Sequence, residues 1–85
     1  MSNVVIYTTA YCSYCRAAKA LLDSKGVEYE EIDLTKDPTA KRRVMEETGW
    51  RTVPIILINK KLIGGYDQLR GLEREGKLDE ILGSK

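Results

Sequence analysis

The chain has 85 residues, which suits one small domain with a modest core, since about this length buries only roughly 60% of the unfolded surface. Fourteen basic and thirteen acidic residues leave a net charge of +1, so no overall field favours nucleic acid or an anionic membrane. No apolar run is long enough to span a membrane, and the first residues do not resemble a secretion signal. We expect a single domain over residues 1–85, located in the cytoplasm.

The first third of the chain predicts a strand, a helix and a second strand. Residues 4–8 are β-branched and aromatic, which favours a buried strand. An apolar period of helical spacing covers residues 13–25 and ends at Gly26, a residue that suits a left-handed cap. Residues 27–34 alternate apolar and acidic side chains, as a strand with one wet face would. The two strands should be parallel and joined by a right-handed crossover.

The remainder predicts a helix, a hairpin and a last helical segment. An aspartate and a proline open a helix over residues 37–49. Residues 53–65 form two apolar runs around a polar turn at 59–61, which indicates a hairpin. A helical period begins at Leu69, is interrupted at Gly76 and then resumes. The sequence therefore predicts an α/β fold, a four-stranded mixed sheet flanked by helices in the order βαβαββα.

Two cysteines, Cys12 and Cys15, are the residues with the most distinctive chemistry. A structural zinc site usually takes four ligands, and the chain has no histidine and no second cysteine pair, so we expect no metal. A structural disulfide would close a loop too short to constrain the unfolded chain, and cytosolic thiols are normally kept reduced. The pair therefore favours redox chemistry. The residues alone leave a zinc site and a structural disulfide open as alternatives.

The position of the pair supports redox chemistry. Cys12 lies at the start of the first predicted helix, where free N–H groups and the positive end of the dipole favour a thiolate. Cysteines so placed can have a pKa well below the free value of about 8.5. Cys15 lies one turn further along and should be less exposed. Because the chain has no histidine, a Cys-His nucleophile is excluded.

Three motifs resemble those of the glutaredoxins, a family with the thioredoxin fold. The sequence Cys-Ser-Tyr-Cys at 12–15 is similar to the family's Cys-Pro-Tyr-Cys, Thr-Val-Pro at 52–54 matches its cis-proline loop, and Gly-Gly-Tyr-Asp at 64–67 resembles its glycine pair and acidic residue. The resemblance spans nearly the whole chain. It implies a thioredoxin-like fold, with Cys12 as the nucleophile and Cys15 as the resolving thiol.

The resemblance also implies where glutathione would bind. The tripeptide would lie across the loops that carry the second and third motifs, which contain Thr52, Val53, Pro54, Gly65, Tyr66 and Asp67. A cis Pro54 would leave the backbone of Val53 free to pair with the cysteinyl residue of glutathione. Without the resemblance, Pro54 could simply begin an edge strand in the trans form.

Several candidate residues have a structural alternative. Asp67 would meet the γ-glutamyl ammonium, with nearby helix N–H groups on the carboxylate, or it could be only an N-cap. By resemblance, Tyr14 would lie beside the sulfur and Arg51 near the substrate. The structural alternatives are that Tyr14 belongs to the core and that Arg51 is solvated. The basic run at 41–43 reads as a solvated helix face, and otherwise one member would receive the glycine carboxylate.

Two departures from the family pattern bear on function. Many relatives carry a lysine three residues before the nucleophile, and here Thr9 stands there. Ser13 replaces proline, which frees a backbone N–H and loosens the turn between the cysteines. Similar serine-containing members hold a two-iron two-sulfur cluster, in which two chains and two glutathiones would supply four thiolates. Cluster binding is therefore the alternative function, and it would require a dimer.

The function that the sequence predicts is glutathione-dependent thiol–disulfide exchange, with glutathione as co-substrate. Its partners would be glutathionylated and disulfide-containing proteins, and without a cluster we expect a monomer. A third alternative is an electron donor reduced directly by thioredoxin reductase.

Overall fold

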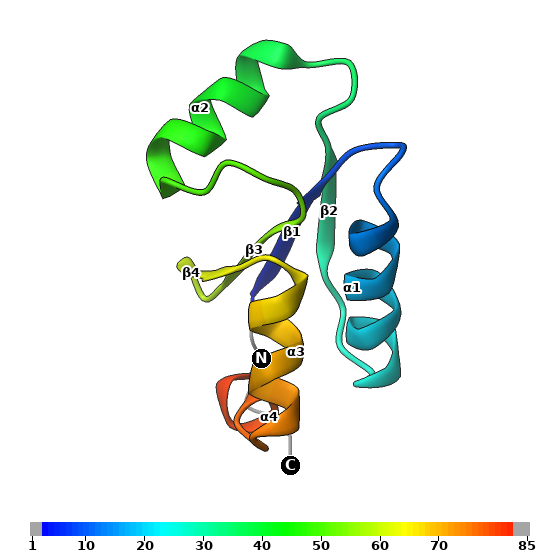
Figure 1. The fold of residues 1–85 in the computed structure, drawn as a ribbon. Coiled ribbons are helices and arrows are strands. Elements are labelled where there is room, and N and C mark those ends of the chain that lie inside the picture. The colour runs from blue at the N-terminus through cyan, green and yellow to red at the C-terminus, as the bar shows by residue number, and fades with distance from the viewer. Residues whose placement is uncertain (1–2, 83–85) are drawn as a thin grey trace.

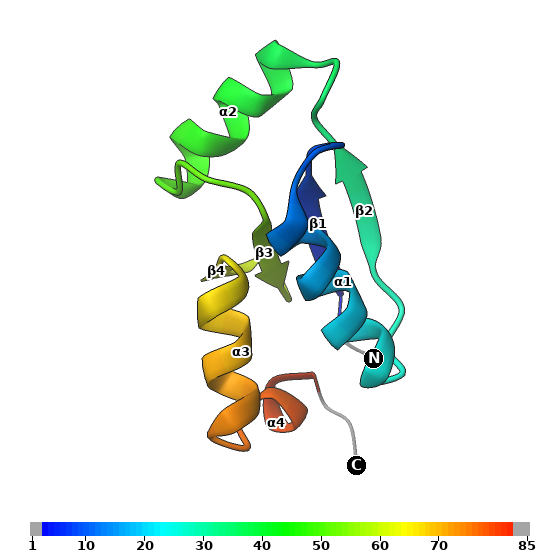
Figure 2. The same cartoon turned by 45° about the vertical axis from the view of Figure 1, so that its right-hand side comes forward.

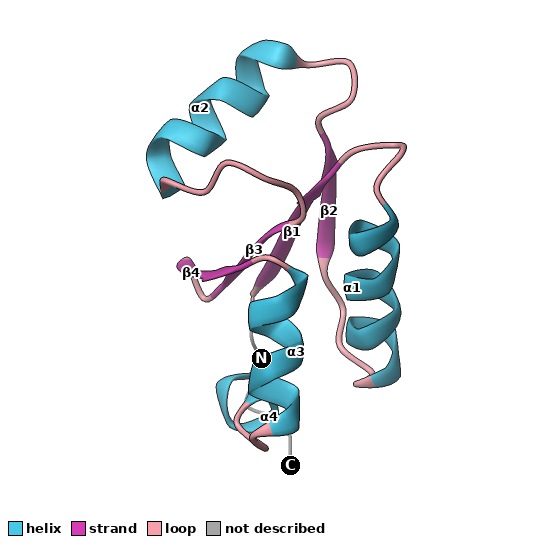
Figure 3. Cartoon of the chain, viewed as in Figure 1, coloured by secondary structure: helices cyan, strands magenta, loops and turns pink. Residues whose placement is uncertain are grey.

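The computed structural model describes residues 3–82, which form four strands and four helices. In chain order these are β1 (Val4–Thr8), α1 (Ser13–Ser24), β2 (Glu30–Asp33), α2 (Pro38–Thr48), β3 (Ile55–Ile58), β4 (Lys61–Gly64), α3 (Tyr66–Arg74) and α4 (Leu78–Leu82). Figure 3 shows the strands at the centre and the helices around them. Within residues 3–82, no helix is both long and apolar enough to cross a membrane.

The four strands form one mixed sheet in the order β2-β1-β3-β4. Strands β1 and β2 are parallel, whereas β1 pairs with β3, and β3 with β4, in antiparallel register. The predicted mixed sheet and the parallel pair are therefore confirmed. Strand β2 lies on one side of β1, and the β3–β4 hairpin lies on the other.

The main core lies between the sheet and the helices α1 and α3, which are side by side in both views (Figures 1 and 2). Alternate residues of β1 are buried, so Val4 and Ile6 face Ala18 and Leu22 of α1, as the period of two in a strand requires. Leu69 anchors α3 to the same cluster. Helix α2 lies apart from these helices, at the end of the sheet where β1 and β2 end (Figure 1).

Helix α2 begins and ends where its caps predict. The carboxylate of Asp37 accepts a hydrogen bond from the Ala40 N–H at 3.0 Å, and Pro38 occupies the first helical position. At the other end, Gly49 has a φ of 74° in the left-handed region, and its N–H donates to the carbonyl of Met45.

Other boundaries differ from the sequence-based expectation. Strand β2 is shorter than residues 27–34, because only Glu30–Asp33 pair with β1. The last segment is two helices, α3 and α4, which are separated around Gly76. The hairpin turn contains two residues, Asn59 and Lys60, since Ile58 pairs directly with Lys61.

The hairpin turn offers a test of backbone strain. Asn59 and Lys60 have φ values of 53° and 68°, as a type I′ turn requires, although glycine is preferred at the second position. We expect Lys60→Gly to raise the free energy of unfolding by about 0.5–1 kcal/mol, because glycine relieves the left-handed conformation. Urea unfolding at an unchanged m-value would measure the gain.

A glycine in the neighbouring strand provides the control for this prediction. Lys61→Gly lies in β4 and should lower the free energy of unfolding, since glycine weakens a strand. A loss of stability in Lys60→Gly as well would contradict the prediction and show that the lysine side chain makes a stabilising contact.

Candidate active site

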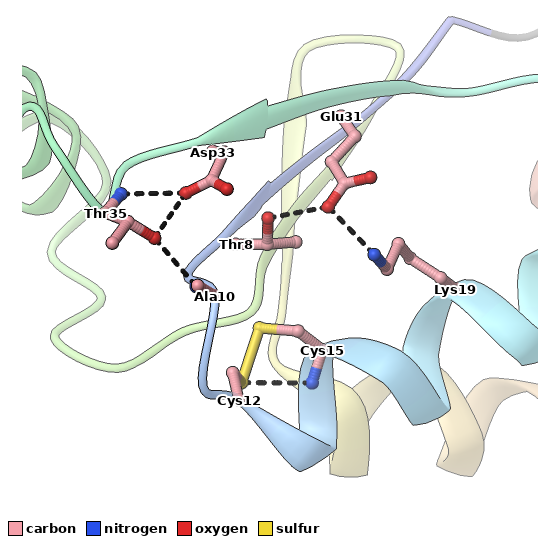
Figure 4. A network of polar contacts seen from close by, with 8 residues as sticks. All are labelled: Thr8, Ala10, Cys12, Cys15, Lys19, Glu31, Asp33 and Thr35. Atoms are coloured by element: carbon pink, nitrogen blue, oxygen red, sulfur yellow. Dashed lines mark hydrogen bonds and ion pairs between the residues drawn. A yellow bond between two sulfur atoms is a disulfide. The ribbon is translucent and has the colours of Figure 1, made fainter.

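The two cysteines lie at the N-terminus of α1 and are joined by a disulfide (Figure 4). Cys12 is the N-cap, with extended backbone angles, and its Sγ accepts a hydrogen bond from the Cys15 N–H at 3.0 Å. The first turn of α1 contains no acidic residue, so the positive end of the helix dipole is not neutralised there. Cys12 is partly exposed, whereas Cys15 is only 1% exposed. One sulfur can therefore be reached from solvent while the other is inside.

The loop before β3 lies against the reactive sulfur. The Val53–Pro54 peptide bond is cis, which confirms the expectation from the family motif, and Pro54 is buried. The carbonyl oxygen of Val53 lies 3.7 Å from the Sγ of Cys12. Backbone polar groups of an extended loop are thus beside the disulfide, where they can pair with a bound peptide.

A groove of about 440 Å³ runs from this loop to the start of α3. Its lining includes most of the predicted site residues together with two that the sequence did not suggest: Tyr14, Trp50, Thr52, Val53, Pro54, Gly65, Tyr66, Asp67 and Gln68. The rings of Tyr14 and Tyr66 have centroids 6.1 Å apart and are tilted by 31°. This pair brings the first and third motifs together at one wall of the groove.

The start of α3 differs from one expectation. The N-cap is Gly65, not Asp67, so the alternative reading of Asp67 as the capping residue is wrong. The Gly65 N–H donates to the Oε1 of Gln68 at 3.0 Å, and this bond satisfies the backbone there. Asp67 is an exposed residue of the first helical turn, so its carboxylate is available to a ligand in the groove.

Close packing explains why the residue before this cap is glycine. Gly64 has a φ of 121°, and a Cβ at this position would lie 2.9 Å from the side chain of Gln68 and 3.2 Å from that of Trp50. The backbone can approach both side chains only without a side chain of its own.

Trp50 and Gln68 are the groove residues that sequence reasoning missed. The only feature of the sequence that could have indicated Trp50 as a groove residue is its position next to the predicted residue Arg51. The indole N–H of Trp50 is buried without a hydrogen-bond partner in the described part of the chain.

Arg51 lies in a neighbouring groove rather than in that of Asp67. This second groove, of about 620 Å³, runs along α2 and contains Lys41 and Arg42 with Arg51. Arg43, the third member of the basic run, is exposed and does not line it. Three positive side chains therefore gather beside the loop that leads to Val53.

A polar network ties α1 to the edge strand β2 (Figure 4). The Glu31 carboxylate accepts hydrogen bonds from Lys19 at 2.9 Å and from the hydroxyl of Thr8 at 2.8 Å. Thr8 is 1% exposed and is the one buried polar side chain among the described residues. The hydrogen bond from Lys19, followed by that from Thr8, lowers the pKa of Glu31. Since Lys19 lies one turn after Cys15, the network fixes the helix that carries the disulfide.

A second network holds the turn before Cys12. The Oγ1 of Thr35 accepts a hydrogen bond from the Ala10 N–H at 2.7 Å, and the N–H of Thr35 donates to Asp33 at 2.8 Å. The Thr35 hydroxyl also donates to Asp33, and these bonds lower the pKa of that carboxyl. The turn is thereby attached to the end of β2.

Between residues 3 and 82, no three histidine, cysteine, aspartate or glutamate side chains gather as a metal site would require.

These features define a class of protein. A cysteine pair at a helix N-terminus, beside a cis-proline loop and a peptide-sized groove in a thioredoxin-like fold, is the arrangement of a thiol–disulfide oxidoreductase.

Comparison with known proteins gives the family. Residues 4–63 match the family model described as glutaredoxin. A glutaredoxin of Pseudomonas aeruginosa is 48% identical over 96% of this chain and 98% of its own length, and glutaredoxin 3 of Escherichia coli is 43% identical over 96% and 99%. A buckwheat glutaredoxin–glutathione complex superposes with a TM-score of 0.91 at 34% identity, covering 96% of this chain and 77% of the other. The chain belongs to the glutaredoxin family and is a glutathione-dependent thiol–disulfide oxidoreductase.

The lowered pKa of Glu31 predicts a pH-dependent stability. Below the ordinary value of 4.5 the unfolded chain takes up the proton first, so the stabilisation is present above that pH and is lost as the pH falls through the lower folded value. We expect Glu31→Gln to lower the free energy of unfolding by about 0.5–1 kcal/mol at neutral pH, allowing for screening of this partly exposed group. Urea unfolding between about pH 7 and pH 2 would follow the difference.

Glu80→Gln is the matched control, because it removes an exposed carboxylate outside this network. Its effect on stability should be small. A loss in Glu31→Gln that stays constant down to the lowest pH would contradict a contribution from the charge.

Proposed function

We propose that Cys12 is the nucleophile for glutathione mixed disulfides. Its thiolate attacks the glutathionyl sulfur, the bond between glutathione and the substrate breaks, and the substrate leaves as a thiolate that takes up a proton. A second glutathione thiolate then attacks the glutathionyl sulfur on Cys12, which releases glutathione disulfide and regenerates the Cys12 thiolate. One free glutathione is consumed for each mixed disulfide reduced, and the glutathione disulfide that forms contains this glutathione and the one carried by the substrate.

With protein disulfides, Cys15 acts as the resolving thiol. Cys12 attacks one sulfur and forms a mixed disulfide with the protein, and the other protein sulfur leaves. Cys15 loses its proton and attacks the Sγ of Cys12, which releases the reduced protein and leaves the Cys12–Cys15 disulfide. Two glutathiones reduce that bond in turn. The proximity of the two sulfurs supports this route.

The observation that carries the proposal is the cap of α1. The Sγ of Cys12 occupies the place of a capping oxygen and accepts the N–H of Cys15 at 3.0 Å. A negative sulfur accepts a stronger hydrogen bond than a neutral one, and the uncompensated helix dipole favours the same charge. The helix end thus stabilises both the attacking thiolate and the thiolate that leaves in the regeneration step.

Glutathione is proposed to bind along the groove, as the complex with the buckwheat relative suggests. The Val53 backbone would pair with the cysteinyl residue, and Tyr14, Thr52, Pro54 and Tyr66 would enclose it. Asp67 would meet the γ-glutamyl ammonium, and the N–H groups at Gly65 and the start of α3 would face the γ-glutamyl carboxylate. The glycine carboxylate would extend toward Arg51, with Lys41 or Arg42 beside it.

We propose further that residues 1–85 are one domain that acts as a monomer in the cytoplasm. One main hydrophobic cluster joins the sheet, α1, α3 and α4, which supports a single domain. Exchange with glutathione needs a reducing pool, which supports the compartment. Cluster binding by a dimer and reduction by thioredoxin reductase stay predictions, since no observation on the described residues favours either.

The first test separates the two cysteines. Cys12→Ser should lower turnover of a small glutathione mixed disulfide by at least about 10³-fold, because the nucleophile is lost. Cys15→Ser should keep turnover within about threefold, because the route with one thiol never uses Cys15. Formation of glutathione disulfide measures both rates.

A protein disulfide serves as the control substrate for this pair of variants. With it, Cys15→Ser should accumulate the mixed disulfide with Cys12, which mass spectrometry detects. Equal loss in both variants with the small substrate would refute the proposed roles.

The second test concerns the charged end of the groove. Asp67→Ala should raise KM for glutathione by about 5- to 20-fold, the value of a charge-assisted hydrogen bond reduced by solvent screening. Steady-state kinetics against glutathione concentration would show the change. Asp23→Asn, which alters the net charge equally at the far end of α1, should leave KM unchanged. Loss of thermal stability in Asp67→Ala with an unaltered KM would contradict the role in binding.

A further inference from the structure

Tyr11, the residue directly before Cys12, has an exposed side chain. Among the described residues, the exposed large apolar side chains are Tyr11, Tyr14 and Leu62, and the first two flank Cys12. Tyr14 lines the groove, whereas Tyr11 is 95% exposed and does not. A ring in that position contributes nothing to the core, and exposed aromatic side chains are favoured where a protein binds a partner.

Tyr11 is not part of the lining of the groove proposed to bind glutathione. Tyr11 lies in the turn between β1 and α1, and the groove lies on the side of β1 where β3, β4 and α3 are found. Strand β2 is on the opposite side of β1. A ligand confined to the groove therefore does not extend to the β2 side of Cys12.

A further hollow lies on the β2 side of β1. It has a volume of about 390 Å³ and is lined by Ala10, Asp33, Thr35 and Lys36. The hydrogen bonds from Ala10 to Thr35 and from Thr35 to Asp33 fix its wall (Figure 4). Ala10 directly precedes Tyr11 and Cys12, so this hollow adjoins the turn that carries both residues.

We propose that the hollow and Tyr11 bind the polypeptide of a protein substrate. The occupant is an extended segment with a glutathionylated cysteine and an apolar residue next to it. This inference rests on the proposed function. Glutathione fills the groove of about 440 Å³, whereas a polypeptide continues on both sides of its cysteine and has to cross the surface around Cys12. Tyr11 packs on the apolar residue, and the adjoining backbone extends into the hollow.

The proposal assigns Tyr11 to one half of the reaction. In the first half, the Cys12 thiolate attacks the glutathionyl sulfur, and the bond to the protein breaks with the protein leaving as a thiolate. The protein is present only in this half. In the second half, glutathione attacks the Cys12–glutathione disulfide, and nothing occupies the surface of Tyr11. Tyr11 therefore determines substrate specificity without acting on the reacting atoms.

The test compares a large and a small substrate of the same chemistry. The large one is a nine-residue peptide with a central glutathionylated cysteine and leucine on either side, and the small one is the cysteine–glutathione mixed disulfide. Tyr11→Ala should lower kcat/KM for the peptide by about five- to tenfold, as expected for loss of an aromatic contact. Its kcat/KM for the small substrate and its KM for glutathione should stay unchanged.

Two further variants complete the design. Leu62→Ala removes an exposed apolar side chain of β4 away from Cys12, and it should affect neither substrate. Tyr11→Phe should restore the rate with the peptide, because the ring makes the contact. An equal loss with both substrates, or no loss with the peptide, would overturn the assignment. Failure of the unmodified protein to turn over the small substrate would overturn the proposed function instead.

Discussion

The reactive end of the molecule depends on the hydrogen bond from the Cys15 N–H to the Sγ of Cys12 at 3.0 Å. An N-cap is usually an oxygen side chain, and here sulfur takes that position. The same bond caps the helix and stabilises negative charge on the sulfur, so helix formation and thiolate stabilisation are one interaction. No histidine is present and Thr9 supplies no charge, so in the proposed mechanism the helix end provides the activation.

This cap can work only if the turn before it has a fixed conformation. The Leu34 N–H donates to the carbonyl of Thr8, and the Ala10 N–H donates to the Oγ1 of Thr35, so the segment that directly follows β2 holds the beginning of the turn. On the helix side, Lys19 and Thr8 meet at Glu31. The exposed edge strand therefore has a specific task, because it orients the N-terminus of α1 against the loop of Val53.

Local physics explains which features could be predicted from the sequence. Caps are encoded by neighbouring residues, so Asp37, Pro38 and Gly49 predicted α2 within one residue at each end. The residues of the groove were predicted in a different way, from the resemblance of three motifs to those of the glutaredoxins. The role of Asp67 was ambiguous because Gly65, the actual N-cap, has no side chain by which a cap could be predicted. Its hydrogen bond with Gln68 forms only after folding. Trp50 and the hollow at Lys36 depend on the packing of distant segments, which no local pattern records.

The placement of charge separates two tasks that a lysine beside the nucleophile would combine. Such a lysine would stabilise the thiolate and attract glutathione at once. In this chain the dipole of α1 acts on the sulfur, whereas Lys41, Arg42 and Arg51 line the groove along α2. In the proposed binding mode these cations attract the glycine carboxylate at a distance from Cys12. Salt screens exposed charges more than it screens a short hydrogen bond, so the two tasks respond differently to ionic strength. In the proposed mechanism, backbone geometry activates the nucleophile, and side chains recruit the co-substrate.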